Sequence, residues 1–210
     1  MAILTNKRPQ NPAEAWQALL AGNQRFVQDT REHPNQDVDR RAAIASAQVP
    51  FAALFGCSDS RLSAEIIFDV GLGDLFVVRN AGQVIAETIL GSLEYAVEVL
   101  KVPLILVLGH DQCGAVSAAI DATKGKLAAK GQFIQHIVAA IQPTVTHANS
   151  IGRGDIDGIT ELHIEDTINE IKSRSRVISD AIKSGSLGIV GANYELSGGE
   201  VHRITAVGNV

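Results

Sequence analysis

The sequence predicts an α/β fold in which helices flank a mostly parallel central β-sheet. Short apolar runs that end in or near glycine alternate with longer stretches of helical spacing across residues 51–196. These runs are apolar throughout, a pattern typical of strands that are covered on both faces. Strands separated by helices in this way usually pair in parallel.

We expect a single domain, because 210 residues are enough to bury a core and fall within the usual size of one domain. Residues 1–50 are interpreted as an N-terminal helical arm and residues 51–210 as an α/β core. In the arm, PAEAWQALLAGNQRFVQ has apolar residues at helical spacing, and Pro12 suits a first helical turn. RRAAIASA is a second, shorter helical segment.

In the core, four apolar runs predict strands and the intervening stretches predict helices. The strands are FAALFG, LFVVRNAG, PLILVLGH and SLGIVGANYEL. The helices are AEIIFDVG, AETILGSLEYAVEVL and CGAVSAAID, then a segment around Phe133–Ile141 and a long helical pattern across Glu161–Ser184.

Composition argues against several classes of partner. The formal net charge of −5 at pH 7 argues against a protein that binds nucleic acid through a basic face. No apolar stretch is long enough to span a membrane, and MAILTNKRPQNPAEAW lacks the apolar segment of a signal peptide. Two cysteines are a poor disulfide framework. We therefore expect a cytoplasmic protein with reduced thiols and no membrane partner.

Three side chains that can bind a metal follow two of the predicted strands. Cys57 ends the first strand, and His110 and Cys113 follow the third. If those strands are neighbours, the three side chains converge on one crevice at the carboxyl edge of the sheet. Zinc prefers thiolate and imidazole ligands, and catalytic zinc sites use three protein ligands with a fourth position open. The simpler alternative is that each cysteine is a small buried apolar residue.

Asp59 and Arg61 place two opposite charges in the loop CSDSR, directly after Cys57. A carboxylate held by a guanidinium beside a metal is a common means of orienting a metal-bound water. Taken alone, the pair is better explained as a surface salt bridge.

The motifs CSDSR and GHDQCGA together resemble those of the β-class carbonic anhydrases, most closely the actinobacterial members. GNQRF, AEIIFDVGLGDLFVVRNAG, GSLEYAV, VPLILVLGH and LGIVGANYEL resemble that family in the same order and spacing, so the resemblance covers residues 12–200. It implies one Zn²⁺ per chain, held by Cys57, His110 and Cys113, and the interconversion of CO2 and bicarbonate.

The resemblance also implies that Asp59 and Arg61 form the catalytic dyad. In the family's open state, a zinc-bound hydroxide attacks CO2 while Asp59 accepts its hydrogen bond and pairs with Arg61. In the closed state, Asp59 itself is the fourth zinc ligand. Because two thiolates neutralise the ion, the bound water should be less acidic than at three-histidine sites, where its pKa is about 7. We therefore expect activity to rise toward alkaline pH.

Further resemblance to plant-type members implies a substrate pocket at a dimer interface. Gln48, Phe76 and Tyr95 stand at the positions that line the CO2 site in those enzymes. The backbone N–H of Gly114 is a candidate donor to bound bicarbonate. Phe76 and Tyr95 would otherwise be interpreted as core residues.

Assembly follows from the same resemblance. A pocket shared between chains makes a homodimer the minimum unit, and tetramers are common among relatives. The N-terminal helices, with Trp16 and Phe26 as apolar anchors, are expected to extend over a partner subunit.

One position departs from another branch of the family. There, a tryptophan three residues before the first cysteine forms part of a non-catalytic bicarbonate site. This chain has Leu54 at that position, whereas Arg79 and Tyr194 match the other two members of the site. We expect plant-like behaviour without strong inhibition by bicarbonate.

Three alternative functions stay open. A cysteine phosphatase or rhodanese-like transferase would use Cys57 as its nucleophile, but such loops place five residues between cysteine and arginine, and CSDSR has three. A carbon disulfide hydrolase would keep the fold and the metal. A non-catalytic protein would use Cys57, His110, Cys113 and Asp59 as a closed structural zinc shell.

The other histidines are candidates for moving a proton, and the sequence marks none of them out. We interpret each one as a surface residue or a satisfied helix residue: His33, His136, His147, His163 and His202.

Overall fold

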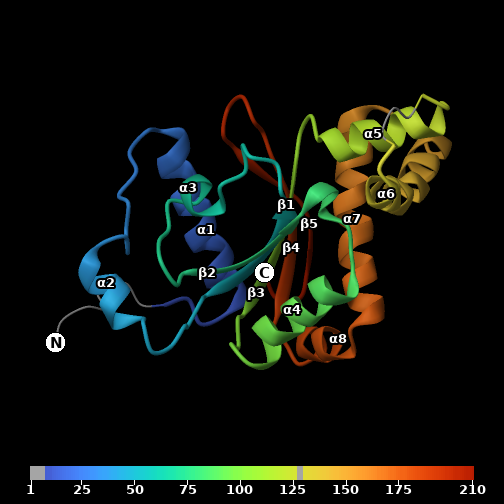
Figure 1. Ribbon diagram of the computed structural model, residues 1–210. Coiled ribbons are helices and arrows are strands. Elements are labelled where there is room, and N and C mark those ends of the chain that lie inside the picture. The colour runs from blue at the N-terminus through green and yellow to red at the C-terminus, as the bar shows by residue number, and fades with distance from the viewer. Residues whose placement is uncertain (1–7, 127–129) are drawn as a thin grey trace.

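The computed structural model describes residues 8–126 and 130–210. Within them, a five-stranded sheet has the strand order β2-β1-β3-β4-β5 and lies between helices (Figure 1). The strands β1 to β4 run parallel, and β5 is antiparallel to β4. This confirms the predicted α/β class. The strands are β1 (Ala52–Cys57), β2 (Leu75–Asn80), β3 (Leu104–His110), β4 (Gly188–Tyr194) and β5 (Val201–Val207).

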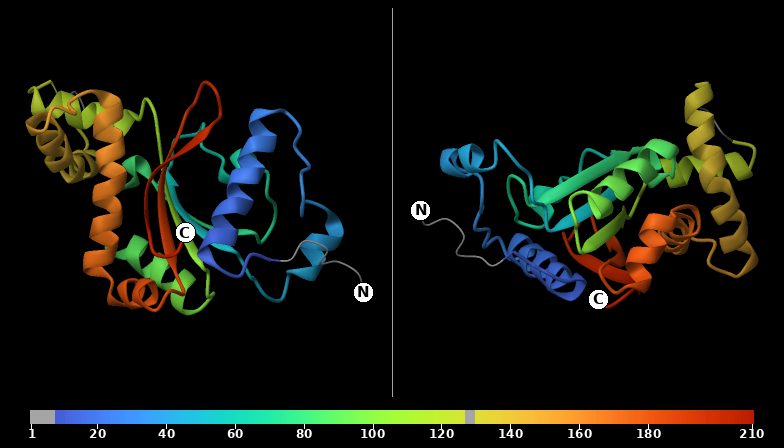
Figure 2. Two further views of the ribbon diagram at one scale, coloured as in Figure 1. Left: turned by 180° about the vertical axis from the view of Figure 1, so that it is seen from behind. Right: turned by 90° about the horizontal axis from the view of Figure 1, so that it is seen from below.

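The helices cover both faces of the sheet. Figure 2 shows α1 on one side of the strands and α4, α7 and α8 on the other. A short 3-10 helix, η1, follows β2. The elements are α1 (Pro12–Val27), α2 (Val38–Ala43), α3 (Ala64–Ile67), η1 (Ala81–Gln83), α4 (Glu87–Glu98), α5 (Gly114–Thr123), α6 (Gln132–Ser150), α7 (Ile156–Arg174) and α8 (Arg176–Lys183).

The central strands are buried on both faces, as their uniform apolar sequences predict. Every residue of β1 and of β3 is buried. Neighbouring residues of a strand point to opposite faces, so Leu54 joins the cluster that contains Trp16 of α1, whereas Phe55 joins the cluster that contains Leu93 of α4. The two clusters hold the sheet from both sides and fix the positions of its carboxyl ends.

Helix α1 packs against its own sheet. The Asn11 side chain accepts a hydrogen bond from the Glu14 N–H and caps the helix, and Trp16 is only 3% exposed within this chain. The expectation that Trp16 anchors a contact with a partner subunit is therefore not met. None of the residues of α2 is buried, and an extension of the N-terminal segment over a partner stays a prediction.

Three elements differ from the expected pattern. The strand β5 is not predicted, because VHRITAV is not apolar throughout and only its first residue, Val201, is buried. The expected helix over Glu161–Ser184 is two helices, α7 and α8, since Ser175 adopts an extended conformation and its side chain caps the Ile178 N–H. The segment AEIIFDVG forms only the four-residue helix α3.

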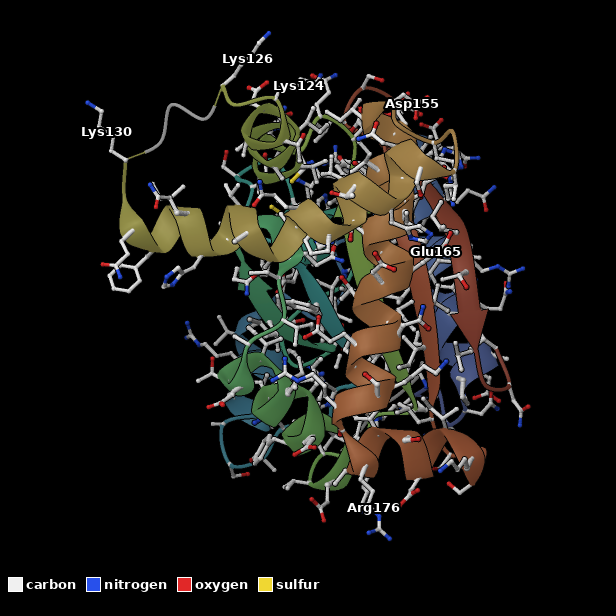
Figure 3. All side chains as sticks on the ribbon, turned by 90° about the vertical axis from the view of Figure 1, so that its right-hand side faces the viewer. Lys124, Lys126, Lys130, Asp155, Glu165 and Arg176 are labelled. Atoms are coloured by element: carbon white, nitrogen blue, oxygen red, sulfur yellow. The ribbon has the colours of Figure 1, made fainter. Side chains whose placement is uncertain are left out.

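Helix α6 extends well beyond the expected segment around Phe133–Ile141. Figure 3 shows α6 crossing α7, with its N-terminal end beside the labelled Lys130 projecting past the rest of the molecule. Within residues 8–126 and 130–210, none of the helices combines the length and the apolar character that crossing a membrane requires.

Candidate metal centre

The carboxyl ends of β1 and β3 lie side by side, because these two strands are hydrogen-bonded neighbours. Cys57 is the last residue of β1, His110 is the last residue of β3, and Cys113 is the N-cap residue of α5. The ligand atoms of the three residues all lie within 4.8 Å of one another, and all three residues are buried. The structure thus brings together the three residues that the sequence places at strand ends.

A sharp turn between β3 and α5 brings Cys113 back toward the strand end. Gln112 has a φ of 50°, in the left-handed region that reverses the chain within few residues. The Asp111 N–H donates to the Tyr194 carbonyl oxygen at 3.2 Å, and its Oδ1 accepts from the Leu196 N–H at 2.8 Å. The end of β4 therefore anchors the loop that carries the second cysteine.

The imidazole of His110 is prepared for a metal. Its Nδ1 lies 2.8 Å from the Asp111 carbonyl oxygen, which can only accept, so Nδ1 carries the hydrogen and Nε2 is left with a free lone pair. That Nε2 atom is buried without a hydrogen-bond partner among the residues that the structure describes. A buried unpaired nitrogen is costly. A metal ion between the three side chains removes that cost.

The thiols of Cys57 and Cys113 are hydrogen-bonded to each other, and Cys57 is the one that ionises first. A hydrogen bond from Cys113, assisted by the backbone N–H groups of Gly82 and Asp59, outweighs burial and lowers the pKa of Cys57 to about 4. The hydrogen bond to Cys57 and burial in turn raise the pKa of Cys113. A divalent cation takes the place of the shared proton, since metals bind cysteine as thiolate.

Asp59 borders this group and is held by Arg61. The guanidinium donates from Nε to Oδ1 at 2.8 Å and from Nη2 to Oδ2 at 2.7 Å, and the Arg61 backbone N–H donates to Oδ1 at 3.0 Å. These hydrogen bonds lower the pKa of Asp59 well below its usual range. Asp59 Oδ2 also lies 4.0 Å from His110 Nε2. An ionised carboxylate therefore stands at the edge of the metal group.

Arg79 holds the backbone of the same loop. Its Nε donates to the Cys57 carbonyl oxygen at 2.8 Å and its Nη2 to the Asp59 carbonyl oxygen at 2.7 Å. Leu54 and Tyr194 are both buried. Arg79 is thus engaged in fixing Cys57 and Asp59, and the expected absence of a regulatory bicarbonate site stays a prediction.

Two of the residues expected around the substrate, Phe76 and Tyr95, lie apart from the metal group of their own chain. The Phe76 and Tyr95 rings pack together with centroids 6.0 Å apart. Phe76 lies four residues before the end of β2 that pairs with Cys57, about 13 Å away at 3.3 Å per residue. Gln48 is exposed, and Gly114 begins α5 directly after Cys113. A pocket that Gln48, Phe76 and Tyr95 share with a second chain stays a prediction.

Sequence reasoning missed part of the pocket wall. Besides the three ligand residues, the pocket is lined by Gly82 and Gln83 of η1 and by Thr160 and His163 of α7. Gly82 has a φ of 74°, and a Cβ there would lie 2.7 Å from the Cβ of Ala115. The glycine in RNAGQ signals a tight turn, but no local pattern links α7 to the site.

Fold and site together define the chain as an α/β metalloprotein. Its buried centre of two cysteines and one histidine, next to an ion-paired carboxylate, has the three protein ligands of catalytic zinc sites. The sequence matches the family model described as carbonic anhydrase over residues 52–201, and the chain belongs to that family.

Individual relatives agree with this assignment. The chain is 48% identical over 201 residues to carbonic anhydrase 2 of Mycobacterium tuberculosis (strain ATCC 25618 / H37Rv), covering 95% of this chain and 96% of that protein. It is 45% identical over 200 residues to the carbonic anhydrase of Mycolicibacterium smegmatis, covering 95% and 97%. The Coccomyxa β-carbonic anhydrase solved with acetazolamide has a TM-score of 0.71 at 24% identity, covering 91% of this chain and 87% of that chain, and so shares the fold.

These findings confirm the resemblance drawn from the two motifs. The expectation of a carbonic anhydrase, a lyase, is confirmed by the family and by its mycobacterial members. The expectation of zinc is confirmed in the same way, since the family uses zinc and the group of Cys57, His110 and Cys113 is placed to bind one metal ion.

Proposed function

We propose that the chain catalyses the reversible hydration of CO2 to bicarbonate and a proton at a centre where Cys57, His110 and Cys113 hold one zinc ion. The observation that carries this proposal is the buried three-residue group with an ionised, arginine-paired carboxylate at its edge. The mycobacterial carbonic anhydrases support it, because they match nearly the whole chain.

Each residue of the site has a distinct part in this reaction. Zinc bound at the three ligands supplies a Lewis acid that lowers the pKa of a water molecule and so provides a nucleophile for CO2. Cys57 and Cys113 bring two negative charges to the centre. His110 presents Nε2 because its Nδ1–H is bound by the Asp111 carbonyl.

Asp59 orients the nucleophile. An ionised carboxylate only accepts hydrogen bonds, so a water molecule between Asp59 and the three ligands directs a hydrogen to Asp59 and its free lone pair toward the substrate. Arg61 fixes the position of Asp59 by donating hydrogen bonds to both of its carboxylate oxygens. The same hydrogen bonds hold Asp59 back from serving as a fourth ligand, as it would in a closed state.

The geometry argues against phosphate or sulfur transfer by Cys57. An oxyanion in the CSDSR loop would need the Arg61 guanidinium, but Asp59 occupies it with two short hydrogen bonds. The carboxylate would also repel a phosphate. Two alternatives are left: a carbon disulfide hydrolase with the same metal centre, and a protein whose zinc is purely structural. Activity assays with both substrates distinguish them from a carbonic anhydrase.

Zinc-loaded protein should be assayed with CO2, by stopped-flow with a pH indicator, and with carbon disulfide, by release of hydrogen sulfide. We expect rapid CO2 hydration and no comparable release of hydrogen sulfide. The matched Asp59→Asn variant should keep its zinc and lose CO2 hydration. Hydrolysis of carbon disulfide alone, or full zinc occupancy with neither activity, would contradict the proposal.

We further propose a cytoplasmic homodimer, with a tetramer as the larger assembly, in which each chain is one domain with its arm over residues 1–50. Exposed apolar residues support assembly: Phe133 is 77% and Ile134 50% exposed on the projecting end of α6, and Tyr95 is 44% exposed. Light scattering after gel filtration tests this. A monomer at micromolar concentration would contradict it.

A further inference from the structure

Helix α7 contributes a buried histidine that the proposed reaction does not use. His163 is 8% exposed, and its Nε2 lies 2.8 Å from the carbonyl oxygen of Gly82. It lines the pocket around the metal ligands and also a second cavity of about 350 Å³, whose other walls include residues of α6 and the carboxylates Asp166 and Glu170. His163 therefore stands between the metal group and the α6 side of the molecule.

The turn that His163 contacts is strained. Gly82 and Gln83 both have positive φ angles, 74° and 54°, and a non-glycine residue in that region persists only where its surroundings hold it. The Asn80 side chain bridges the two ends of the turn. Its Nδ2 donates to the Val84 carbonyl oxygen at 2.7 Å, and its Oδ1 accepts from the Val84 N–H at 3.0 Å. His163 holds the middle of the turn from the side of α7.

Gly82 links this turn to the metal group. Gly82 and Cys57 line the same pocket, and the Gly82 N–H is one of the groups that lower the pKa of the Cys57 thiol. The Gly82 carbonyl oxygen accepts from His163. A hydrogen bond to a metal-bound thiolate restrains the sulfur and tunes the charge that it gives to the metal. The turn can do this only while Gly82 keeps its orientation.

We propose that His163 is a positioning residue of the metal centre, which holds Gly82 so that the Gly82 N–H remains on the Cys57 sulfur. This inference rests on the proposed zinc centre, and its experiments include readouts that do not depend on CO2 hydration. It assigns a function to a buried polar side chain whose burial otherwise only costs folding free energy.

The contacts of His163 favour positioning over proton transfer. The Gly82 carbonyl only accepts, so Nε2 carries a hydrogen and cannot receive a proton from the site. Burial lowers the pKa of His163, although the Gly82 carbonyl, Asp166 and Glu170 act in the opposite direction. The neutral ring with its hydrogen on Nε2 is the form that donates to Gly82.

Two substitutions separate the effect of the His163 N–H donor from the effect of the side-chain volume. His163→Leu keeps most of the volume and removes the N–H, whereas His163→Gln keeps an N–H at a similar reach. We expect His163→Leu to weaken zinc binding about 10–100-fold, the range found when outer-shell partners of metal ligands are removed. We expect His163→Gln to bind zinc within a few-fold of the wild type. Competition with a chromogenic chelator measures both.

Cobalt-substituted protein gives a second readout. The sulfur-to-cobalt charge-transfer bands should shift in His163→Leu and return in His163→Gln. CO2 hydration by His163→Leu should fall, and the pH at which its activity rises should move upward. Unchanged zinc affinity and unchanged cobalt spectra in a folded His163→Leu protein would overturn the proposal. So would a loss of hydration that added imidazole restores, since that indicates proton transfer.

A neighbouring variant controls for damage to α7. Thr167→Val removes the hydrogen bond from Thr167 Oγ1 to the His163 carbonyl oxygen, at 2.7 Å, without touching the His163 ring. It should leave zinc affinity unchanged even if the melting temperature falls. A loss of zinc affinity in Thr167→Val equal to that in His163→Leu would overturn the specific role of the ring.

One measurement needs no variant, so it can test the proposal even if His163→Leu does not fold. Nitrogen-15 NMR of the zinc-loaded wild type should show His163 as a neutral ring with its hydrogen on Nε2, at pH 7. A hydrogen on Nδ1 instead would overturn the proposal, because Nε2 could not then donate to Gly82.

Discussion

Arg61 binds both carboxylate oxygens of Asp59, a residue only two positions away, with N–O distances of 2.8 and 2.7 Å. Both residues belong to the loop that follows Cys57, and Asp59 Oδ2 lies 4.0 Å from His110 Nε2. The ion pair therefore borders the group of predicted metal ligands.

Asp59→Asn should separate metal binding from catalysis. The amide has nearly the same shape as the carboxylate, but it can donate as well as accept, so it no longer fixes the orientation of the water. We expect kcat/KM for CO2 hydration to fall about 10²–10⁴-fold, the usual contribution of a positioned acid or base. Zinc content should stay the same. Retention of the wild-type rate would remove Asp59 from the mechanism.

Arg61→Gln should impair catalysis through the position of Asp59, not through its ionisation. Arg61 lowers the pKa of Asp59, and without the guanidinium this pKa rises toward the ordinary value of about 3.9, which is still far below neutral pH. The loss of activity should therefore persist at pH 7 to 9. Arg61→Lys keeps the charge but not the paired geometry, and we expect an intermediate rate. Full recovery of Arg61→Gln at high pH would contradict this account.

Asp69 should stabilise the fold, and the effect should depend on pH. Burial raises the pKa of Asp69, but the N–H groups of Glu32 and His33 and the Arg25 guanidinium outweigh it and lower this pKa. Arg25 Nε lies 2.6 Å from Asp69 Oδ2. Asp69→Asn should lower the free energy of unfolding at pH 7 by about 1–3 kcal/mol, since buried hydrogen bonds to a charge are lost.

The sign of the pH effect follows from the lowered pKa of Asp69 in the folded state. Its stabilisation is complete above the unfolded pKa of about 3.9 and is lost as the pH falls through the folded value. The difference between wild type and Asp69→Asn in urea denaturation should therefore shrink in strongly acidic buffer. Asp29→Asn is the control, because Asp29 is 84% exposed in its pair with Arg31 and should change stability by less than about 0.5 kcal/mol. A constant difference across pH would contradict the assignment.

Zinc should stabilise the folded chain. Without a metal, the unpaired Nε2 of His110 and the two coupled thiols remain buried. Zinc at a hundred times its dissociation constant should add about 2.7 kcal/mol by mass action, and Tm should rise accordingly. Magnesium should have no such effect, since it prefers oxygen ligands. Cys57→Ser should abolish the zinc-dependent rise, and an equal rise in Cys57→Ser would place the ion elsewhere.

The parallel part of the sheet could be predicted because its strands are buried on both faces. A strand such as β3, with every residue buried, has to be apolar throughout, and this makes it visible in the sequence. Only one residue of the edge strand β5 is buried, so its sequence pattern differs from those of the central strands. The break between α7 and α8 depends on the backbone and side chain of Ser175, which hydrophobic periodicity does not report.

The metal ligands could be predicted for the same topological reason, since adjacent parallel strands end at one edge of the sheet. His163 could not, because it comes from the middle of a helix far along the chain from Cys57, and its link to the site is a hydrogen bond to a backbone carbonyl, that of Gly82. Phe76 and Tyr95 pack on each other, away from the ligands of their own chain. Their role in a substrate pocket depends on a second chain.

The most direct test of a zinc-dependent hydration site is stopped-flow CO2 hydration on protein of measured zinc content, at pH 7 and at pH 9. Two thiolate ligands make the nucleophilic water less acidic than at three-histidine sites, where its pKa is about 7. We predict a rate proportional to zinc content, rapid at pH 9 and markedly slower at pH 7. Full zinc content with no hydration at either pH would contradict the account.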